Sequence, residues 1–230
     1  PAATAMVQTA LAGPGDLLIT DSQGRRIGRV NGQFIDEMPA AFASVLPGGL
    51  GLPGQPLFYL PQAEPLKVEI GASGSGGDTA VSQYGPGYAI VADNVQATPG
   101  ETQTLRFSSD GREVSLTPGT TQSPDLGLMA ETGSGSLRLE IRGGQVAEDQ
   151  TVSLRRTEES GGKLIYSRQS AGAGQYEVHV IRVSAGGAQE FTSDNVSIGQ
   201  GDTHAVLYGA WDGSGGMTLQ IDRGSNGSID

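Results

Sequence analysis

The sequence predicts an all-β protein made of two antiparallel, immunoglobulin-like β-sandwich modules in tandem. Short segments alternate apolar and polar residues at intervals of about ten residues, which is typical of sandwich strands with one face in water. A two-part motif also occurs twice in the chain, with the same spacing between its parts. Asp93-Asn94-Val95 precedes Gly100-Glu101-Thr102 by four residues, and the same gap separates Asp194-Asn195-Val196 from Gly201-Asp202-Thr203. Because each copy leads through an apolar strand into an Asp-Gly turn, the repeat predicts two modules of common architecture.

The first residues predict a short N-terminal helix or linker over residues 1–15. Residues 1–12 are rich in alanine, and Gly13-Pro14-Gly15 would end a helix. Four apolar residues are spaced to share one helical face, namely Met6, Val7, Ala10 and Leu11. We therefore expect a helical segment or a linker ahead of the first sandwich.

Residues 16–122 are predicted to form the first sandwich module. Asn31-Gly32 stands between the alternating residues of the segment 27–35 and predicts a hairpin with a type I′ turn. Residues 36–56 carry four prolines and several glycines, so we expect a long loop with a functional or packing role there. The other strands expected in this module cover residues 17–20, 57–60, 66–70, 88–92, 104–107 and 114–116.

Residues 123–230 are predicted to form the second module. The segment 117–124 has the Pro, Gly and Thr content of a boundary, and strand patterns restart at Leu126. The strands expected here cover residues 137–141, 152–154, 164–166, 176–180, 206–208 and 217–221. The repeated pairs Asp93-Asn94 and Asp194-Asn195 are expected to organise turns through side-chain to backbone hydrogen bonds.

The composition excludes several kinds of chemistry and partner. The chain has no cysteine, which removes disulfides, zinc thiolate sites and thiol nucleophiles. A formal net charge of −11 repels nucleic acid, so no nucleic-acid partner is expected. No apolar run approaches the ~18 to 20 residues that a membrane-spanning helix needs, so no membrane insertion is expected. The acidic balance, with little lysine and much Gly, Ser and Thr, is typical of bacterial extracellular proteins.

Two stretches carry a resemblance to known proteins. Thr20–Gly28, followed by Asn31-Gly32-Gln33, resembles segments near the C-terminal ends of large secreted bacterial proteins. The block Tyr176–Asp222, which contains Tyr208-Gly209-Ala210-Trp211-Asp212-Gly213, is similar to terminal modules of such proteins. Those accessory modules are immunoglobulin-like or pre-peptidase-type sandwiches that stand beside another domain. The resemblance implies presentation, adhesion or assembly at an extracellular or cell-surface location, and it brings no catalytic residue.

The last residues contain a partial calcium-loop pattern. Asp222, Asn226, Gly227 and Asp230 fall at positions one, five, six and nine of a loop of the EF-hand or dockerin kind. Gly224 occupies the third position, which normally supplies an oxygen ligand, and the printed sequence stops before position twelve. The pattern predicts weak Ca²⁺ binding by Asp222, Asn226 and Asp230, and a Gly-rich acidic tail is the alternative. No other cofactor is expected.

Trp211, the single tryptophan, and Tyr208 lie next to an Asp-Gly turn. Exposed aromatic rings beside polar groups would form a platform for a sugar ring. The alternative is that both rings fill the core or an interface, as large aromatics in small sandwiches usually do.

Nothing in the sequence predicts an enzyme. Of the two histidines, His179 is expected to face outward from an alternating strand, and His204 follows the repeated Gly-Asp-Thr where the first copy has Gln103. Neither histidine stands in a metal-ligand or nucleophile spacing. Adjacent carboxylates such as Glu158-Glu159 point to opposite faces of a strand or into solvent, so they do not form a glycosidase pair.

These observations predict a non-catalytic structural or protein-interaction region that acts in presentation, adhesion or self-assembly. Its expected partners are other domains of the same parent protein or copies of itself. The alternative is a carbohydrate-binding module, supported by calcium or not, whose partner would be a cell-surface polysaccharide.

Overall fold

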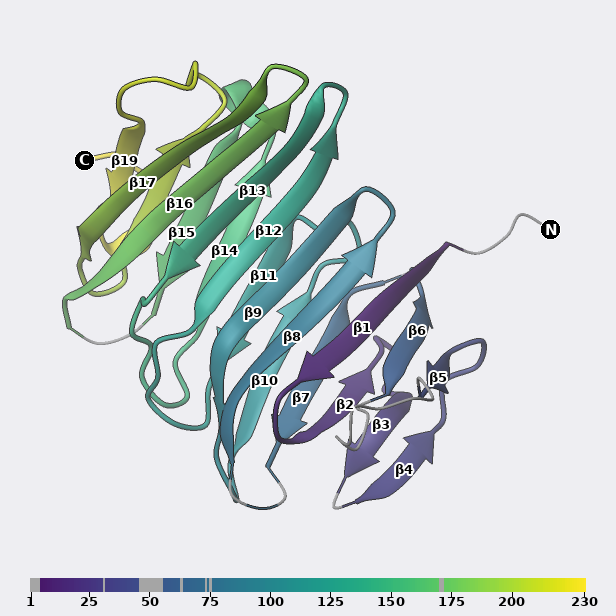
Figure 1. Cartoon of the computed structure of the whole chain (residues 1–230). Coiled ribbons are helices and arrows are strands. Elements are labelled where there is room, and N and C mark those ends of the chain that lie inside the picture. Colours follow the sequence, from purple (N-terminus) through teal and green to yellow (C-terminus); the bar gives the residue numbers. More distant parts are fainter. Residues whose placement is uncertain are drawn as a thin grey trace.

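The computed structural model describes residues 5–30, 32–45, 56–62, 64–72, 74, 76–169 and 172–230. It confirms the all-β class, because the strands form two antiparallel sheets that pack on each other and do not close into a barrel (Figure 1). Two single-turn 3-10 helices, η1 (Glu159–Gly161) and η2 (Arg223–Ser225), are the only helical elements among these residues. None of the described residues belongs to a helix long and apolar enough to cross a membrane.

In the described ranges, nineteen strands are divided between the two sheets. The first sheet has nine strands, in the spatial order β17 (Gly187–Ile198), β16 (Gly174–Ser184), β13 (Gly135–Arg142), β12 (Asp125–Thr132), β9 (Tyr88–Ala97), β8 (Gly77–Gly85), β1 (Met6–Ala12), β6 (Leu57–Pro61) and β5 (Phe42–Ser44). The second has ten, in the order β19 (Thr218–Asp222), β18 (Thr203–Leu207), β15 (Lys163–Arg168), β14 (Val152–Thr157), β11 (Glu113–Thr117), β10 (Thr102–Phe107), β7 (Leu66–Gly71), β2 (Asp16–Thr20), β3 (Arg26–Val30) and β4 (Gln33–Asp36).

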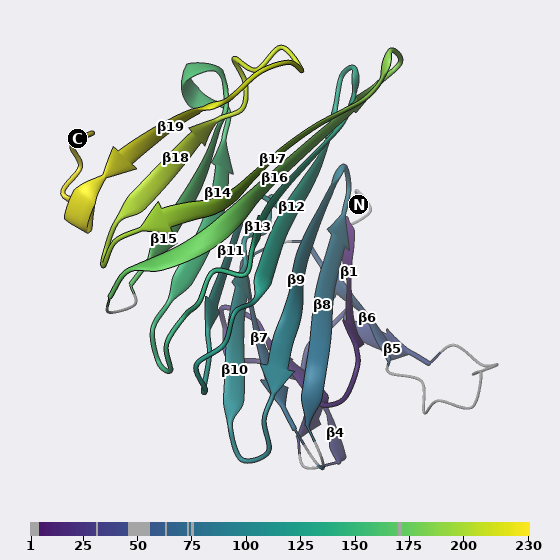
Figure 2. The same cartoon turned by 60° about the vertical axis from the view of Figure 1, so that its left-hand side comes forward.

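From β8 onward, the chain places successive hairpins alternately in the two sheets. The hairpins β8–β9, β12–β13 and β16–β17 lie side by side in the first sheet, and β10–β11, β14–β15 and β18–β19 in the second (Figure 2). Each hairpin pairs antiparallel with the previous hairpin of its own sheet. Immunoglobulin sandwiches use Greek-key connections instead. This chain therefore builds its two packed sheets by repeating one step.

Both sheets continue across the predicted module boundary at residues 122 and 123. In the first sheet β12 pairs with β9, as in Leu128 opposite Ile90. In the second sheet β14 pairs with β11, as in Leu154 opposite Val114. These four side chains are fully buried and belong to one hydrophobic core that extends from β1 to β18. The parts predicted as modules, residues 16–122 and 123–230, are thus joined through both sheets and share a core.

The N-terminal segment is a strand, so the predicted helix is wrong. β1 lies between β6 and β8 and pairs antiparallel with both. Val7, Thr9 and Leu11 are buried while Gln8 and Ala12 are exposed, which is the period of two of a strand. The apolar spacing of this segment fits a helix as well as a strand. The segment forms a strand because it pairs with β6 on one side and with β8 on the other.

The hairpin predicted around residues 31 and 32 is present. Val30 pairs with Gln33, so the loop between β3 and β4 has two residues. Gly32 has a positive φ of 76°, as a type I′ turn needs, while Asn31 lies outside the described residues. The predicted loop 36–56 contains the short strand β5, and its residues 46–55 also lie outside the described part.

The repeated Asp-Asn pairs lie inside strands, so the prediction that they organise turns is wrong. Between Thr79 opposite Val95 and Val81 opposite Ala92, the β9 strand has two residues, Asp93 and Asn94, against one residue of β8. This is a β-bulge, and Asn94 has a positive φ of 53° within it. One extra residue reverses the alternation of side chains between the two faces of the sheet. The bulge therefore lets the apolar side chains of β9 before and after it point into the core.

The third hairpin repeats this bulge. Asp194 and Asn195 of β17 lie opposite one residue of β16, and Asn195 has a φ of 56°. The middle hairpin carries Gly143, with a φ of 67°, directly after β13. The hairpins of the first sheet begin at residues 77, 125 and 174, so the structural repeat is about 50 residues long. The motif visible in the sequence joins the first copy to the third.

Candidate functional site

Tyr208 and Trp211 come together in the segment after β18, but both are buried. Trp211 is 5% exposed, and its ring packs edge-on against Phe191, with 6.2 Å between the ring centroids. The Arg182 guanidinium lies 5.5 Å from the Trp211 ring centroid and donates hydrogen bonds to the carbonyls of Trp211 and Tyr208, at 2.8 and 2.9 Å. The Tyr208 hydroxyl donates to the Thr157 carbonyl at 3.2 Å.

These contacts decide between the two interpretations of the aromatic pair. A platform for sugar needs an exposed ring face, and Arg182 and Phe191 cover Trp211 instead. Burial also raises the pKa of the Tyr208 hydroxyl. The structure therefore agrees with core packing, and the exposed platform predicted at Tyr208 and Trp211 is absent.

Of the three predicted calcium ligands, Asp222 is the last residue of β19, and Asn226 and Asp230 lie in the segment after it. The Asp222 carboxylate accepts the backbone N–H groups of Asn226 and Gly227, at 2.8 and 2.9 Å. The Asp230 carboxylate accepts the Arg223 N–H at 2.8 Å, and the Asn226 side-chain oxygen accepts another backbone N–H. The oxygens thus stabilise the loop itself. Within the described part of the chain, no group of three or more His, Cys, Asp or Glu side chains is placed to hold a metal ion. Calcium binding stays a prediction.

His204 lies inside the sandwich. It is 1% exposed, and its Nδ1 is 2.8 Å from the Tyr176 hydroxyl, which is buried as well. Burial lowers the pKa of His204, so the imidazole is held neutral. The equivalent position of the first copy holds Gln103, which is also fully buried and accepts a hydrogen bond from Gln122 at 2.9 Å. The position therefore holds a buried polar side chain in both copies.

A charged network lies on the outer face of β13, β16 and β17 in the first sheet. Glu140 of β13 is mostly buried and pairs with Arg138 and with Arg142, whose Nε donates at 3.0 Å. His179 of β16 lies directly opposite Glu140 and contacts it through Nδ1 at 3.3 Å. The other ring nitrogen of His179 contacts Glu190 of β17 at 2.5 Å. His179 faces outward as predicted, but it is wedged between two carboxylates.

The side chains of this network hold one another in place. Burial alone would raise the pKa of Glu140, but the hydrogen bonds and charges of Arg138 and Arg142 outweigh burial and lower it. Both nitrogens of His179 contact carboxylates, which holds the ring between Glu140 and Glu190. The sequence signal for the network is Arg138-x-Glu140-x-Arg142, three charged residues on one face of a strand.

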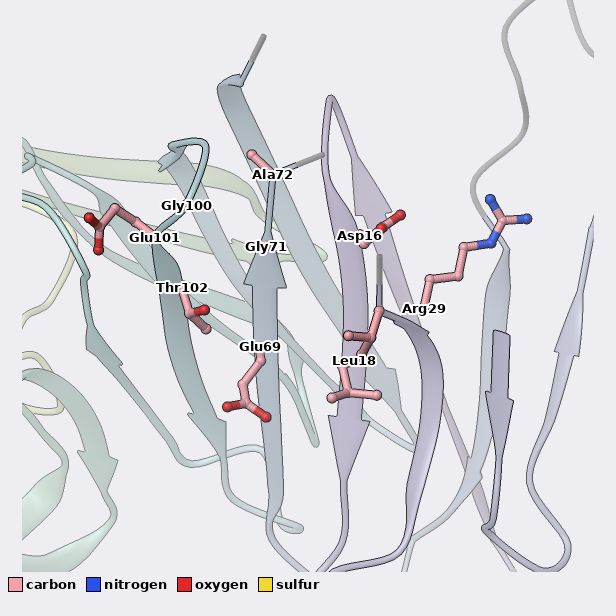
Figure 3. Close-up of a pocket in the computed structure, with 10 residues that line it drawn as sticks. Asp16, Leu18, Arg29, Glu69, Gly71, Ala72, Gly100, Glu101 and Thr102 are labelled. Carbon is pink, nitrogen blue, oxygen red and sulfur yellow. The ribbon is translucent and has the colours of Figure 1, made fainter. Parts of the chain in front are cut away.

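A hollow of about 290 Å³ lies on the outer face of the second sheet (Figure 3). It is lined by Asp16, Leu18, Arg29, Val30, Glu69, Gly71, Ala72, Gly100, Glu101 and Thr102. Glu101 and Arg29 lie on opposite sides of it and point away from each other (Figure 3). Glu69 is paired with Lys67 at 3.0 Å, and Asp16 accepts the Gly32 N–H at 3.3 Å. The hollow offers polar groups to a ligand, but its charges do not converge on one point.

No family model, no curated protein and no solved structure matches this chain. The resemblance to accessory modules of secreted bacterial proteins therefore stays a prediction.

Proposed function

We propose that this chain is a non-catalytic structural and protein-interaction region of a secreted or cell-surface protein, acting in presentation, adhesion or self-assembly. The observation that carries the proposal is the long, unpaired edge at the end of the repeated hairpins. β17 has twelve residues, borders the first sheet and, among the strands that the structure describes, pairs only with β16. An edge strand of this length presents a row of N–H and C=O groups to which another strand can bind.

The opposite end of the sandwich also supports contact with a partner. Phe34 of β4 is 49% exposed and Phe42 of β5 is 52% exposed, and both strands are sheet edges. Phe42 stacks on Tyr59 with 4.6 Å between the ring centroids, which holds its ring in one position. Exposed aromatic residues on rigid elements are typical of interaction surfaces. A sandwich with a surface for contact at each end is suited to joining other domains of its parent protein or further copies of itself.

Light scattering tests the self-assembly part of this proposal. The molar mass should be measured over a wide range of protein concentrations, first with calcium and then with a chelator. A mass that grows with concentration beyond the 23.6 kDa of one chain supports self-assembly. A mass that stays at one chain removes self-assembly from the proposal and leaves presentation and adhesion. Growth in calcium alone would assign the calcium loop a role in assembly.

Carbohydrate binding is the alternative, and the hollow in Figure 3 is what favours it. Glu69 and Thr102 are hydrogen-bonding side chains that line a concave surface of about 290 Å³. A screen against soluble glucans, xylans and peptidoglycan fragments tests this alternative. Binding that is lost in Glu69→Ala and Thr102→Ala, and retained in Glu148→Ala on an exposed loop, would support it.

A further inference from the structure

We propose that the outer edge of β17 binds an extended polypeptide strand, antiparallel to Gly187–Asp194, whose inward side chains are apolar and whose outward side chains are basic. The inference rests on the proposed function, since it names the site and the kind of partner. Figure 1 shows β17 at the outside of its sheet.

The two earlier hairpins of the first sheet show how such an edge is filled. β12 covers the outer edge of β9 from Tyr88 to Asp93, the residue just before the Asn94 bulge. β16 covers the outer edge of β13 from Gly135 to Arg142 in the same antiparallel manner. β17 carries the same bulge as β9 and pairs with its hairpin partner in the same way, but no strand in the described part of the chain pairs with its outer edge. The repeat therefore sets the register, with the first residue of the partner strand opposite Asp194.

The core side of β17 is incompletely covered. In β9 the inward residues Ile90, Ala92 and Val95 are fully buried. In β17 the inward residues Phe191 and Val196 are only partly buried. They line a cavity of about 60 Å³ together with Val206 and Leu219 of the second sheet. Apolar side chains on the inward face of an added strand would complete the burial of this end of the core, and burial of apolar surface favours binding.

Charge indicates what the outward face of the partner carries. Opposite charges face each other across two strands of this sheet, since Arg142 of β13 pairs with Glu177 of β16, and Glu190 of β17 contacts the His179 ring of β16. Glu190 and Asp194 then form an acidic border at the open edge. Basic residues on an added strand would continue the alternation. The formal net charge of −11 favours a basic strand over a second copy of this acidic chain.

The bulge adds a requirement at the start of the partner strand. Asn94 donates its side-chain N–H to Asp125, the first residue of the covering strand β12, at 2.6 Å. The equivalent Asn195 has no such partner within the described part of the chain. A partner strand that begins with an oxygen acceptor, such as Asp, Asn or Ser, would take the hydrogen bond that Asn195 offers.

A synthetic peptide tests the proposal on the whole chain. The peptide has the length of Gly187–Asp194, begins with Asn, and alternates Val or Leu with Lys, so that the apolar residues face inward in the predicted register. A peptide of the same composition in scrambled order is the control. Binding is followed by fluorescence anisotropy of the labelled peptide. Amide hydrogen exchange of the protein locates the bound peptide.

Variants of β17 separate edge binding from nonspecific attraction to an acidic protein. Glu190→Lys should weaken binding of the basic peptide about fivefold, because a cross-strand charge pair is worth up to about 1 kcal/mol. The same variant should gain affinity for a peptide in which Glu replaces Lys. Glu148→Lys changes the net charge equally on an exposed loop and should leave both affinities unchanged. Phe191→Ala should weaken both peptides by removing an inward packing partner.

The expected result is that the peptide protects the amides of Gly187–Asp194 from exchange and that the variants change its affinity as predicted above. Protection elsewhere, equal binding of the scrambled peptide, or no binding would overturn the proposal. If the chain instead dimerises through β17, a second copy is the occupant and the basic strand is wrong. Growth of molar mass without peptide binding would retain the proposed function and reject this site. Absence of both would weaken the proposed function as well.

Discussion

Replacing Asn94 by Ala should destabilise the whole chain, because Asn94 has two roles in the bulge of β9. Its backbone has a φ of 53°, a left-handed conformation that Asn and Gly adopt more easily than other residues. Its side chain donates to Asp125 at 2.6 Å. Ala loses the hydrogen bond and adds backbone strain. The sum of about 1 kcal/mol of strain and about 0.5–1 kcal/mol for an exposed hydrogen bond is about 1.5–2 kcal/mol.

Two further variants separate the two roles. Asn94→Gly loses only the hydrogen bond and relieves the strain, so it should cost about 0.5–1 kcal/mol. Asn195→Ala at the equivalent bulge adds strain but removes no partner, so it should cost about 1 kcal/mol. For a chain of this size, 1 kcal/mol corresponds to about 2–4 °C in Tm. The expected order of destabilisation places Asn94→Ala first.

Urea unfolding followed by Trp211 fluorescence and by far-ultraviolet circular dichroism measures these costs. Trp211 packs against Phe191 of β17 at one end of the sandwich, β9 is the middle strand of the first sheet, and the sheets connect the two regions. One cooperative unit predicts that Asn94→Ala shifts the Trp211 midpoint as much as the dichroism midpoint. A Trp211 midpoint that does not move while the dichroism splits into two transitions would show that residues 16–122 and 123–230 unfold separately. Equal stability of the Ala and Gly variants would refute the role of the left-handed backbone.

Three more predictions concern polar residues. Glu140→Gln should cost about 1–3 kcal/mol at pH 7 by leaving two arginines underpaired. The folded chain lowers the pKa of Glu140, so the ionised carboxylate stabilises the wild type above about pH 4.5, and this stabilisation is lost as the pH falls below that value. The difference in stability between the wild type and Glu140→Gln should therefore shrink at low pH. The folded chain also lowers the pKa of His204, so protons bind the unfolded chain more readily below about pH 6.5 and stability falls there. His204→Gln places the residue type of Gln103 at this position and should therefore reduce the change of the urea midpoint between pH 7 and pH 5. A midpoint that changes with pH as much as in the wild type would contradict this. Asp222→Ala should abolish the calcium heat in isothermal titration, whereas retained heat would place the calcium site elsewhere.

The strands were predictable where they alternate between a buried and a wet face. Period-two patterns are visible at Leu137, Leu139 and Ile141, and all three are core residues of β13. The N-terminal strand was missed because Val7 and Leu11 satisfy a helical and a strand spacing at once. Only the pairing of β1 with its two neighbours in space resolves that ambiguity.

The repeat of about 50 residues was not recognised in the sequence, because different residue types occupy its positions of left-handed backbone conformation. The first and third copies use Asn94 and Asn195, which the sequence shows as a motif. The middle copy uses Gly143 and, in place of Gly100, Asp149 with a φ of 57°. Because Gly, Asn and Asp all tolerate this conformation, the backbone repeats where the residue types do not.

Candidate site residues were predictable only as residue types. The spacing of Asp222, Asn226 and Asp230 suggests calcium ligands, but it does not reveal the backbone N–H groups that their oxygens accept. The burial of Trp211 depends on Arg182 and Phe191 from two other strands. The open edge of β17 could not be predicted, because whether a strand is central or at an edge depends on pairing across the sheet.

Amide hydrogen exchange of the isolated chain at low concentration tests the open edge most directly. Amide groups alternate in direction along a strand, so every second N–H of Gly187–Ser193 should point outward and exchange rapidly. The outward N–H groups of Tyr88–Asp93 in β9, which β12 covers, should be protected. This contrast is the predicted result. Uniformly slow exchange along Gly187–Ser193 would show that the edge is already closed and would contradict the account.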